Sequence, residues 1–305
     1  MIFNILVIAA IFLSVISIIW IPKWQTRKTE MNKSDKWKAE NEFRRTLIQI
    51  FGGVIVIVGL FFTSEQVRQF YISQENMKLE QLSSRYSKAI ELLSKKGSTN
   101  KIGAIYALEQ IVEESPNYLK IVLDVLPVFV KQSEYCQDNE YNKIILPEVQ
   151  AAMTVIARIK NKENTNVEKV YSINLTRAKL KGVELTSANL VKADLREAEL
   201  INAEISYANM QEAILNGANM QGANLKAVNL KIAVLSGVDF QGANLDGADL
   251  EGAVLWFANL QSTNGLTVDQ LLKVKTLYQV RGLAGSLRAA LLERKRELFD
   301  PFEKE

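Results

Sequence analysis

Residues 243–252 read ANLDGADLEG, which is one five-residue unit written twice, and residues 218–225, ANMQGANL, carry the same unit. The unit recurs from Tyr171 to Gln261, with eighteen central residues at every fifth position from Leu175 to Leu260. Every central residue, and every residue two positions before it, is apolar, in a chain that is only 48% hydrophobic. The residue between these two is usually Asn, Asp or Glu. A period this regular predicts a repeat architecture.

A period of five residues fits neither a helix nor a straight strand. On an α-helix five residues advance by about 500°, so the central residues would be spread around the axis. On a strand an odd spacing would send alternate central residues to opposite faces. We therefore expect each unit to be a short extended piece followed by a two-residue corner, such as Gln221-Gly222 or Asp246-Gly247. The two apolar residues then point inward and the residue between them points outward.

The units at 218–225 and 243–252 resemble the A(D/N)LXX units of pentapeptide-repeat proteins. The resemblance implies a right-handed quadrilateral β-helix with four units in each coil. Eighteen units then make four and a half coils, and at ~4.8 Å per stacked layer the solenoid is roughly 21 Å tall. The likeness covers just under a third of the chain. It implies little about activity, because one scaffold can carry many functions.

Composition excludes several kinds of chemistry. The 305 residues include 37 Lys and Arg against 34 Asp and Glu, and a net charge of +3 argues neither for nor against a polyanionic partner. Histidine is absent, which excludes Ser-His-Asp and Cys-His catalysis and His-ligated metal sites. The single cysteine, Cys136, excludes an intrachain disulfide and a cysteine cluster for zinc. We predict that the protein is not an enzyme and uses no metal and no cofactor.

The carboxylates of the repeats have two readings. Glu184 and Glu204 are twenty residues apart, so they stack on one face, and Asn224 continues their column. Stacked Asn side chains can hydrogen-bond along such a column, which is a structural role. The alternative is an acid/base or metal site, but a flat wall implies no concave pocket. We favour the structural role.

Residues 1–63 are predicted to be a membrane anchor with spans at about 2–21 and 46–62. The first run is apolar apart from Asn4 and two serines, and twenty such residues can cross a hydrocarbon core. A cleaved signal peptide is the alternative, but the run lacks a basic n-region and a small-residue cleavage site. The second run, TLIQIFGGVIVIVGLFF, is at the short end for a span, and its alternative is a buried helix of a soluble domain. Membrane lipid is therefore an expected partner.

The distribution of basic residues predicts an orientation. Eight Lys and Arg lie between Lys23 and Arg45, whereas only Arg68 and Lys78 follow within twenty residues of the second run. The positive-inside rule then places the polar connector between the two runs in the cytoplasm and the repeats outside it. We expect an integral protein of a bacterial-type cell membrane.

Residues 64–165 are predicted to form a helical stalk and adaptor. Apolar residues recur at three- and four-residue steps from Glu65 to Lys95, which is typical of an amphipathic helix. Pro127 is expected to kink or split one of the helices that follow. These helices are expected near residues 101–114, 117–132 and 147–160, with a polar linker at 133–145.

Three stretches of this region carry a second resemblance: RYSKAIELL at 85–93, GAIYALEQI at 103–111 and VQAAMTVI at 149–156. They resemble the helical region that precedes the repeats in a membrane-anchored subset of pentapeptide-repeat proteins. They also resemble an antiparallel helix pair of the HEAT kind. The block is expected to cover the first coil, whose open edge would otherwise invite other chains to pair with it.

Residues 265–299 are predicted to be C-terminal capping helices. Thr267 suits an N-cap, with Gln270 three residues later. Apolar residues up to Leu298 form stripes on two helices that are broken near Gly282–Gly285. The chain is thus expected to be α+β, with two transmembrane helices, a helical adaptor, a pentapeptide β-helix at 171–261 and a helical cap.

One face of the solenoid is predicted to change from polar to apolar along its length. The outward positions of that face run Asn174, Asp194, Ile214, Val234 and Val254. The adjoining corner adds two aromatic residues. We name the apolar members of this set the apolar strip: Ile214, Val234, Val254, Trp256 and Phe257. A soluble rod would not normally leave such a strip in contact with water.

Two kinds of occupant would cover the apolar strip. The C-terminal helices can fold back over it with Leu271, Leu277 and Leu291. Alternatively, the strip is a surface for a second copy, giving a homodimer, or for another protein. We favour the fold-back, because the short turn at Asn264-Gly265 lets nearby helices reach the strip.

These features predict a membrane-tethered, non-enzymatic protein–protein interaction or scaffold module with an unidentified protein partner. The resemblance implies one alternative, a DNA mimic that antagonises or protects enzymes of the DNA gyrase type. Such a mimic needs a strongly acidic solenoid, yet residues 171–260 hold ten acidic and seven basic residues. We therefore expect no nucleic acid among the partners.

Overall fold

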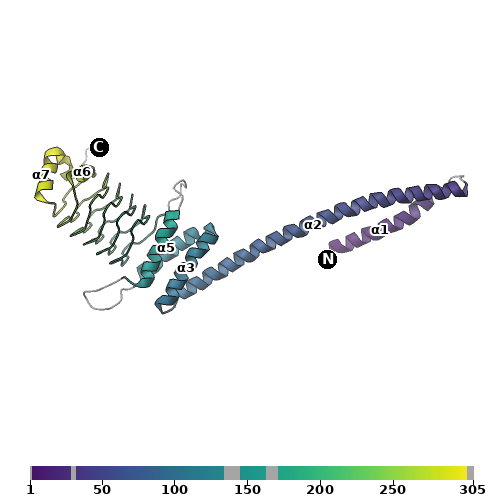
Figure 1. The fold of residues 1–305 in the computed structure, drawn as a ribbon, viewed down its shortest axis with the longest axis horizontal. Helices are drawn as coiled ribbons and strands as arrows, with labels where there is room; N and C mark the ends of the chain where they lie inside the picture. Colours follow the sequence, from purple (N-terminus) through teal and green to yellow (C-terminus); the bar gives the residue numbers. More distant parts are fainter. Residues whose placement is uncertain (1, 29–31, 134–144, 163–170, 301–305) are drawn as a thin grey trace. The chain divides into compact units, whose positions relative to one another are not determined.

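The computed structural model describes residues 2–28, 32–133, 145–162 and 171–300. The chain divides into two units, Met1–Gln81 and Leu82–Glu305, and the long helix α2 (Lys33–Ser94) contributes to both (Figure 1). The linker expected at 133–145 falls almost wholly outside the described residues.

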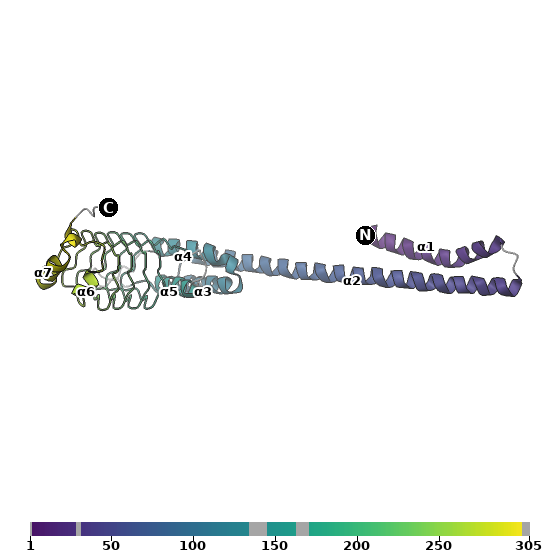
Figure 2. The same cartoon turned by 90° about the horizontal axis from the view of Figure 1, so that it is seen from above.

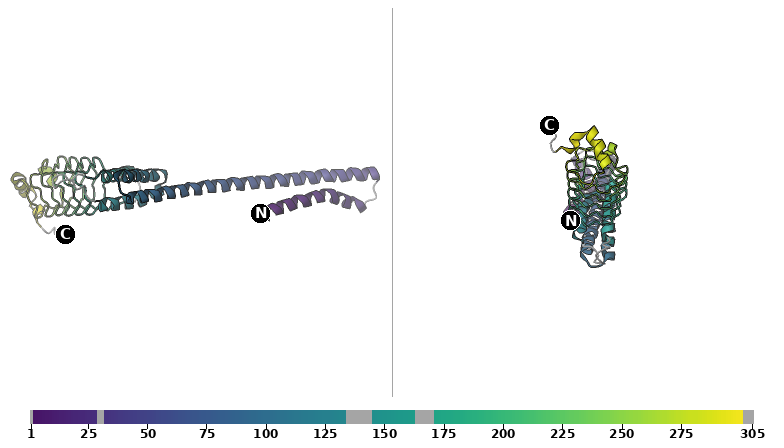
Figure 3. Two further views of the ribbon diagram at one scale, coloured as in Figure 1. Left: turned by 90° about the horizontal axis from the view of Figure 1, so that it is seen from below. Right: turned by 90° about the vertical axis from the view of Figure 1, so that its left-hand side faces the viewer.

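The first unit consists of α1 (Ile2–Gln25), the short 3-10 helix η1 (Thr26–Lys28) and the N-terminal part of α2. In it α1 lies alongside α2 and runs in the opposite direction (Figures 2 and 3). At the turn the Thr26 hydroxyl donates to Glu40 Oε1 at 2.9 Å. The polar connector, expected only to be solvated, is helical from Lys33 onward. Its Lys, Glu and Ala residues are good helix formers, and the helix continues into the apolar run.

One helix among the described residues is long and apolar enough to cross a membrane, and it is α2. The predicted span at 46–62 lies within it, and the apolar window is entirely unburied. The other predicted span, at 2–21, is helical within α1, but the side chains of residues 1–11 lie outside the described part of the chain. Of the two predicted spans, the one at 46–62 therefore corresponds to a candidate membrane-spanning helix among the described residues.

The second unit begins with a helical block. The end of α2 packs with α3 (Ser98–Glu114), the 3-10 helix η2 (Pro116–Tyr118), α4 (Leu119–Gln132) and α5 (Pro147–Lys162). Figure 2 shows α4 beside the pair α3 and α5. The apolar faces of these helices meet in one core, which includes Leu82, Leu108, Leu126 and Ile156. The helices predicted for this region are therefore present.

Pro127 does not split α4, contrary to one of our expectations. The helix is continuous from Leu119 to Gln132, with Pro127 buried inside it. A proline in a helix interior costs about 3 kcal/mol, because it removes a backbone hydrogen bond and crowds the preceding turn. The same helix buries four apolar residues that each contribute about 1.5–3 kcal/mol, and their packing outweighs that cost. These are Val122, Leu123, Leu126 and Val130.

The repeats form a solenoid in which each residue pairs with the residue twenty positions later. Four columns of parallel bridges begin at Asn174, Lys179, Glu184 and Asn189. This pairing confirms four units per coil. All eighteen central residues and all eighteen preceding apolar residues are buried. Each extended piece is only one bridged residue long, because two of every five residues form the corner.

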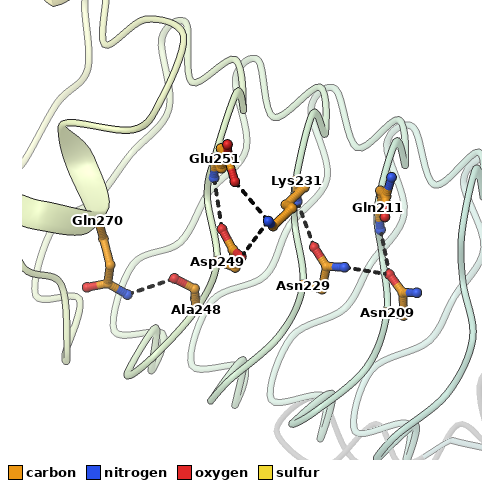
Figure 4. A network of polar contacts seen from close by, with 8 residues as sticks. All are labelled: Asn209, Gln211, Asn229, Lys231, Ala248, Asp249, Glu251 and Gln270. Carbon is orange, nitrogen blue, oxygen red and sulfur yellow. Dashed lines mark hydrogen bonds and ion pairs between the residues drawn. The ribbon is translucent and has the colours of Figure 1, made fainter.

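The outward Asn and Asp residues have a second role, which the sequence reasoning missed. The side-chain oxygen accepts a hydrogen bond from the backbone two residues later, as from Gln211 N to Asn209 Oδ1 at 3.2 Å. Such a bond stabilises the corner that follows. The predicted ladder is also present, since Asn229 Nδ2 donates to Asn209 Oδ1 at 3.0 Å (Figure 4). One side chain thus supports both its own corner and the stacking of coils.

The helical block covers the first coil, as predicted. Gln150 of α5 bonds to both backbone groups of Glu184, and Asn189 Nδ2 donates to Lys160 O at 3.0 Å. The buried Lys160 ammonium donates to Tyr171 O at 2.6 Å. These contacts supply partners for backbone groups at the coil edge that would otherwise be open.

The C-terminal segment differs from the predicted pair of helices. The Thr267–Gln270 capping box is present, but α6 (Val268–Leu271) is a single turn. The chain then resumes the solenoid, with Thr276 paired to Val254 and Arg281 paired to Asn259. The next elements, α7 (Gly285–Arg294) and the 3-10 helix η3 (Arg296–Phe299), follow at this end of the solenoid (Figure 1). Val274 and Leu277 are buried as solenoid residues, so this stretch continues the coil instead of forming a long helix.

Candidate interaction surface

The residues of the apolar strip lie together on one wall of the solenoid. Ile214, Val234 and Val254 are consecutive members of one bridge column, as the twenty-residue phase predicts. Ile214 is 38% exposed, and Val234 and Val254 are half-buried. Trp256 and Phe257 are 42% and 46% exposed at the corner that follows Val254. The strip is therefore an apolar surface in the described structure.

The C-terminal helices do not fold back over the apolar strip, and the preference for that arrangement was wrong. Leu271, Leu277 and Leu291 are fully buried, whereas the strip keeps its exposed residues. The cause is the extra coil segment, which carries the chain onward along the solenoid axis. Leu277 N then donates to Leu298 O at 2.6 Å, so η3 lies against the last coil.

The two aromatic side chains of the strip are held by the coil that follows them. Trp256 Nε1 donates to the Thr276 hydroxyl at 3.1 Å. The rings of Phe257 and Tyr278 meet edge to face, with their centroids 5.8 Å apart. Such pairs are worth about 0.5–1.5 kcal/mol beyond their burial. Both aromatic side chains are thus partly exposed and fixed in position by their neighbours.

The outward residues of the apolar strip cannot accept the backbone hydrogen bond that supports most other corners. On the other walls most outward Asn, Asp and Glu residues accept a backbone hydrogen bond, as Glu204 Oε1 does from Ser206 N at 3.2 Å. Valine and isoleucine have no acceptor for this bond. A net hydrogen bond is worth about 0.5–1.5 kcal/mol, and the strip gives up three of them at Ile214, Val234 and Val254. The corner hydrogen bond therefore does not explain these residues.

Ile232 borders the strip and breaks a second local rule. Its φ is 58°, and it is the β-branched member of the described non-glycine residues with positive φ. Residues held in this region cost about 1–3 kcal/mol, and β-branched ones are rare there. The side chain is nevertheless 59% exposed. The sequence reasoning missed Ile232, although an isoleucine at a corner position otherwise filled by glycine or mostly polar residues was a visible signal.

Charges around the strip are paired. At the N-terminal end of its column, Arg196 Nη2 lies 2.6 Å from Asp194 Oδ2, and this bond holds the pKa of Asp194 below its usual range. Ion pairs also link residues twenty apart on successive corners. They are Arg177–Glu197, Lys192–Glu212, Lys226–Asp246 and Lys231–Glu251, the last of which is drawn in Figure 4. The walls thus carry mixed, largely neutralised charge.

Glu184 and Glu204 occupy structural positions in their column. The carboxylate of Glu204 accepts from Asn224 Nδ2 at 2.9 and 3.1 Å, which continues the ladder. Its hydrogen bonds with Ser206 and Asn224 lower the pKa of Glu204 despite partial burial. The described residues hold no group of three or more Asp, Glu or Cys side chains that could bind a metal ion.

The repeat units match a known sequence family. The family model for pentapeptide repeats matches eight copies, at residues 173–211, 193–231 and 233–264. The chain belongs to the pentapeptide-repeat proteins. No curated protein matches it.

Several solved pentapeptide-repeat structures are similar to part of this chain. One from the cyanobacterium Cyanothece 51142 is 32% identical, with 32% of this chain and 67% of that chain covered and a TM-score of 0.25. One from the Arabidopsis thaliana thylakoid lumen is 20% identical over 37% and 77% of the two chains, with a TM-score of 0.25. QnrB1, a plasmid-mediated fluoroquinolone resistance protein, is 20% identical over 40% and 72%, with a TM-score of 0.25. At these TM-scores the structural likenesses carry no functional argument.

Proposed function

We propose that this pentapeptide-repeat protein is a membrane-tethered, non-enzymatic scaffold whose apolar strip binds a protein partner. The observation that supports the proposal is that the apolar strip and Ile232 beside it depart from the local pattern that stabilises the other corners. Three outward residues give up a corner hydrogen bond, and Ile232 beside them is held at a positive φ. Departures from local rules without a gain in folding are expected at functional sites. Flat apolar surface with fixed aromatic side chains suits a protein partner.

The tether is proposed from α2. Its apolar run at 46–62 is unburied, and a helix of this length and composition can span the hydrocarbon core of a bilayer. Lys and Arg are concentrated before this run, between Lys23 and Arg45, and this distribution supports a location of the repeats outside the cytoplasm.

The non-enzymatic part of the proposal has two supports. Pentapeptide-repeat proteins are generally non-enzymatic. In addition, the polar residues of the walls are used in ladders and corners, as for Asn209, Asn229 and Glu204. The DNA-mimic alternative is disfavoured, because the acids of the corners face bases twenty residues away, as in Lys231–Glu251, and a duplex mimic needs unpaired negative charge.

The partner surface is tested by proximity labelling from an enzyme fused after Glu305 of the full-length chain in native membranes. Val234→Asp adds a charge to the apolar strip, and aspartate suits this outward position because it can accept the corner hydrogen bond. Asn219→Asp adds the same charge to the neighbouring wall and is the matched control. We expect the control to label the wild-type set of proteins and Val234→Asp to lose specific members of it. Identical sets for both variants would contradict the proposal.

The tether and its orientation have a separate test. A reporter that works only outside the cytoplasm, fused after Glu305, is expected to be active and to sediment with membranes. Activity of a cytoplasm-specific reporter at the same position would reverse the orientation. Recovery of the chain in the soluble fraction would overturn the tether itself.

A further inference from the structure

A stretch of α2 between its apolar run and the helical block is uncovered. Every residue from Gln66 to Gln81 is exposed, and burial begins at Leu82. Among the described residues, α1 is the neighbour that could cover this stretch. Its 24 residues span about 36 Å and run antiparallel to α2, which begins at Lys33, so α1 reaches only to about residue 57 of α2. The helix beyond that point needs another partner if its apolar residues are to be buried.

Three apolar residues of the uncovered stretch, Val67, Phe70 and Met77, continue a heptad pattern that begins at Leu60 in the apolar run. We name the set the stalk seam: Leu60, Thr63, Val67, Phe70, Gln74 and Met77, which follow one another at alternating steps of three and four residues. This spacing places them on one face of a helix and is typical of a coiled coil. The four apolar members, Leu60, Val67, Phe70 and Met77, are all exposed.

The face opposite the stalk seam holds paired polar residues, along with two apolar ones. Glu65 Oε1 is 3.2 Å from Arg68 Nη2 and accepts from Gln69 Nε2 at 3.0 Å. These residues satisfy one another on the outer face and need no partner. Ile72 and Leu79 also lie on this outer face, outside the seam.

We propose that the stalk seam packs against the same seam of a second copy, as a parallel, in-register two-stranded coiled coil. The proposal rests on the proposed membrane tether, because two copies whose α2 helices cross the same membrane emerge parallel and at the same height. Each seam residue then faces its own counterpart, and the Gln74 amides can pair with each other, which fixes the register. Tethering also raises the effective concentration of the second copy.

The residues that flank the seam are compatible with this arrangement. In a parallel pair, Gln66 of one helix lies near Tyr71 of the other, and Ser73 lies near Lys78. No like charges oppose each other at these positions. The seam also continues into the apolar run through Val56 and Gly53, where added Cβ atoms at Gly53 would meet open space and two backbones can approach closely.

The test is cysteine cross-linking of the full-length chain in native membranes. Cys136 is the single cysteine, so Cys136→Ser gives a background without thiols. Phe70→Cys and Met77→Cys place a thiol in the seam, whereas Gln69→Cys and Ile72→Cys place one on other faces of the same turns. With a mild oxidant we expect disulfide-linked dimers from the two seam variants, at least tenfold more than from the two reference variants. Equal cross-linking at all four positions, or cross-linking at none, would overturn the proposal.

A disrupting variant adds a second measurement. Val67→Asp in the Met77→Cys chain puts a charge into the seam at an exposed position, where the helix itself tolerates it. We expect dimer formation to fall about tenfold, with Glu75→Asp, on the outer face, as the control that leaves it unchanged. Sedimentation with membranes is recorded for every variant. A soluble chain would overturn the tether, whereas a membrane-bound chain with an unselective cross-linking pattern would overturn only the seam.

Discussion

The side-chain amide of Gln150 bonds to both backbone groups of Glu184. Gln150 Oε1 accepts from Glu184 N at 2.9 Å, and Gln150 Nε2 donates to Glu184 O at 2.9 Å. One coil later, the backbone of Glu204 makes the equivalent pair of bonds with Val183 O and Leu185 N. A helix side chain therefore takes the place of a missing coil at the edge of the solenoid.

Gln150→Ala is expected to destabilise the joint between α5 and the first coil. The change leaves two backbone groups of Glu184 without their partner, at a cost of about 1–3 kcal/mol. The unfolding midpoint of the detergent-solubilised chain in urea reports the loss. Gln241→Ala, at an exposed corner, is the control and should leave the midpoint unchanged. Equal midpoints for the two variants would mean that the amide pair does not support the edge.

Gly282→Ala is expected to disrupt the last coil. A Cβ at Gly282 would lie less than 3.0 Å from the backbone nitrogen and Cα of Gln261, which cannot move independently of the coil. Gly182 has a similar positive φ, +71° against +69°, but a Cβ there meets open space. Gly182→Ala should therefore show only the conformational cost of about 1 kcal/mol, and Gly282→Ala several times more. Thermal unfolding of both variants measures the difference, which comparable losses would contradict.

Ile232→Asn is expected to stabilise the solenoid by about 1 kcal/mol, because asparagine tolerates a positive φ far better than a β-branched residue. The rise in the urea midpoint checks this. Ser262→Asn, at another corner with positive φ, is a control in which no β-branched residue is relieved. The same Ile232 variant should weaken labelling of the partner of the apolar strip. A more stable chain with undiminished labelling would separate Ile232 from the partner surface.

The repeat solenoid could be predicted because its signal is local and periodic, and its four sides were implied by the resemblance to pentapeptide-repeat proteins. Burial requires an apolar residue at two positions in every five, and each unit satisfies this without exception from Ile173 to Leu260. The capping box at Thr267 was likewise predictable, because it needs only two residues at a fixed spacing. In both cases short-range chemistry decides the structure.

The C-terminal coil could not be predicted from the same period. The turn of α6 adds two residues, so Val254 pairs with Thr276 at a spacing of twenty-two instead of twenty. Val274, Leu277 and Val280 are three apart, a spacing that suits a helix face as well as a solenoid. Helices were expected here, and the short turn at Asn264-Gly265 led to the expected fold-back over the apolar strip. Ile214 and Trp256 stay exposed because the C-terminal coil carries the chain onward instead of over the strip, and this path depends on tertiary packing.

Glu148 is expected to make the helical block sensitive to acid. Its buried carboxylate accepts from the Ser98 hydroxyl at 2.7 Å and from Lys101 Nζ at 3.4 Å. Burial alone would raise the pKa of Glu148, but the bonds from Ser98, the α5 backbone and Lys101 together lower it below the ordinary value of 4.5. The folded chain therefore binds the proton less readily than the unfolded chain. The stabilisation from Glu148 is present above pH 4.5 and is lost as the pH falls through the lower, folded-state pKa.

Glu148→Gln tests this sign. The variant cannot ionise at this position, so it should be less stable than the wild type near neutral pH and should lose less stability on acidification. Urea midpoints of the two chains are compared between about pH 6 and about pH 3, the interval that spans the titration of such a carboxyl. Asp124→Asn, which removes an exposed carboxylate from α4, is the control and should follow the wild type. The prediction would be wrong if Glu148→Gln lost as much stability as the wild type over this interval. The Ser98–Glu148–Lys101 cluster would then contribute the same free energy of unfolding in both protonation states of Glu148, and the acid sensitivity would come from other carboxylates.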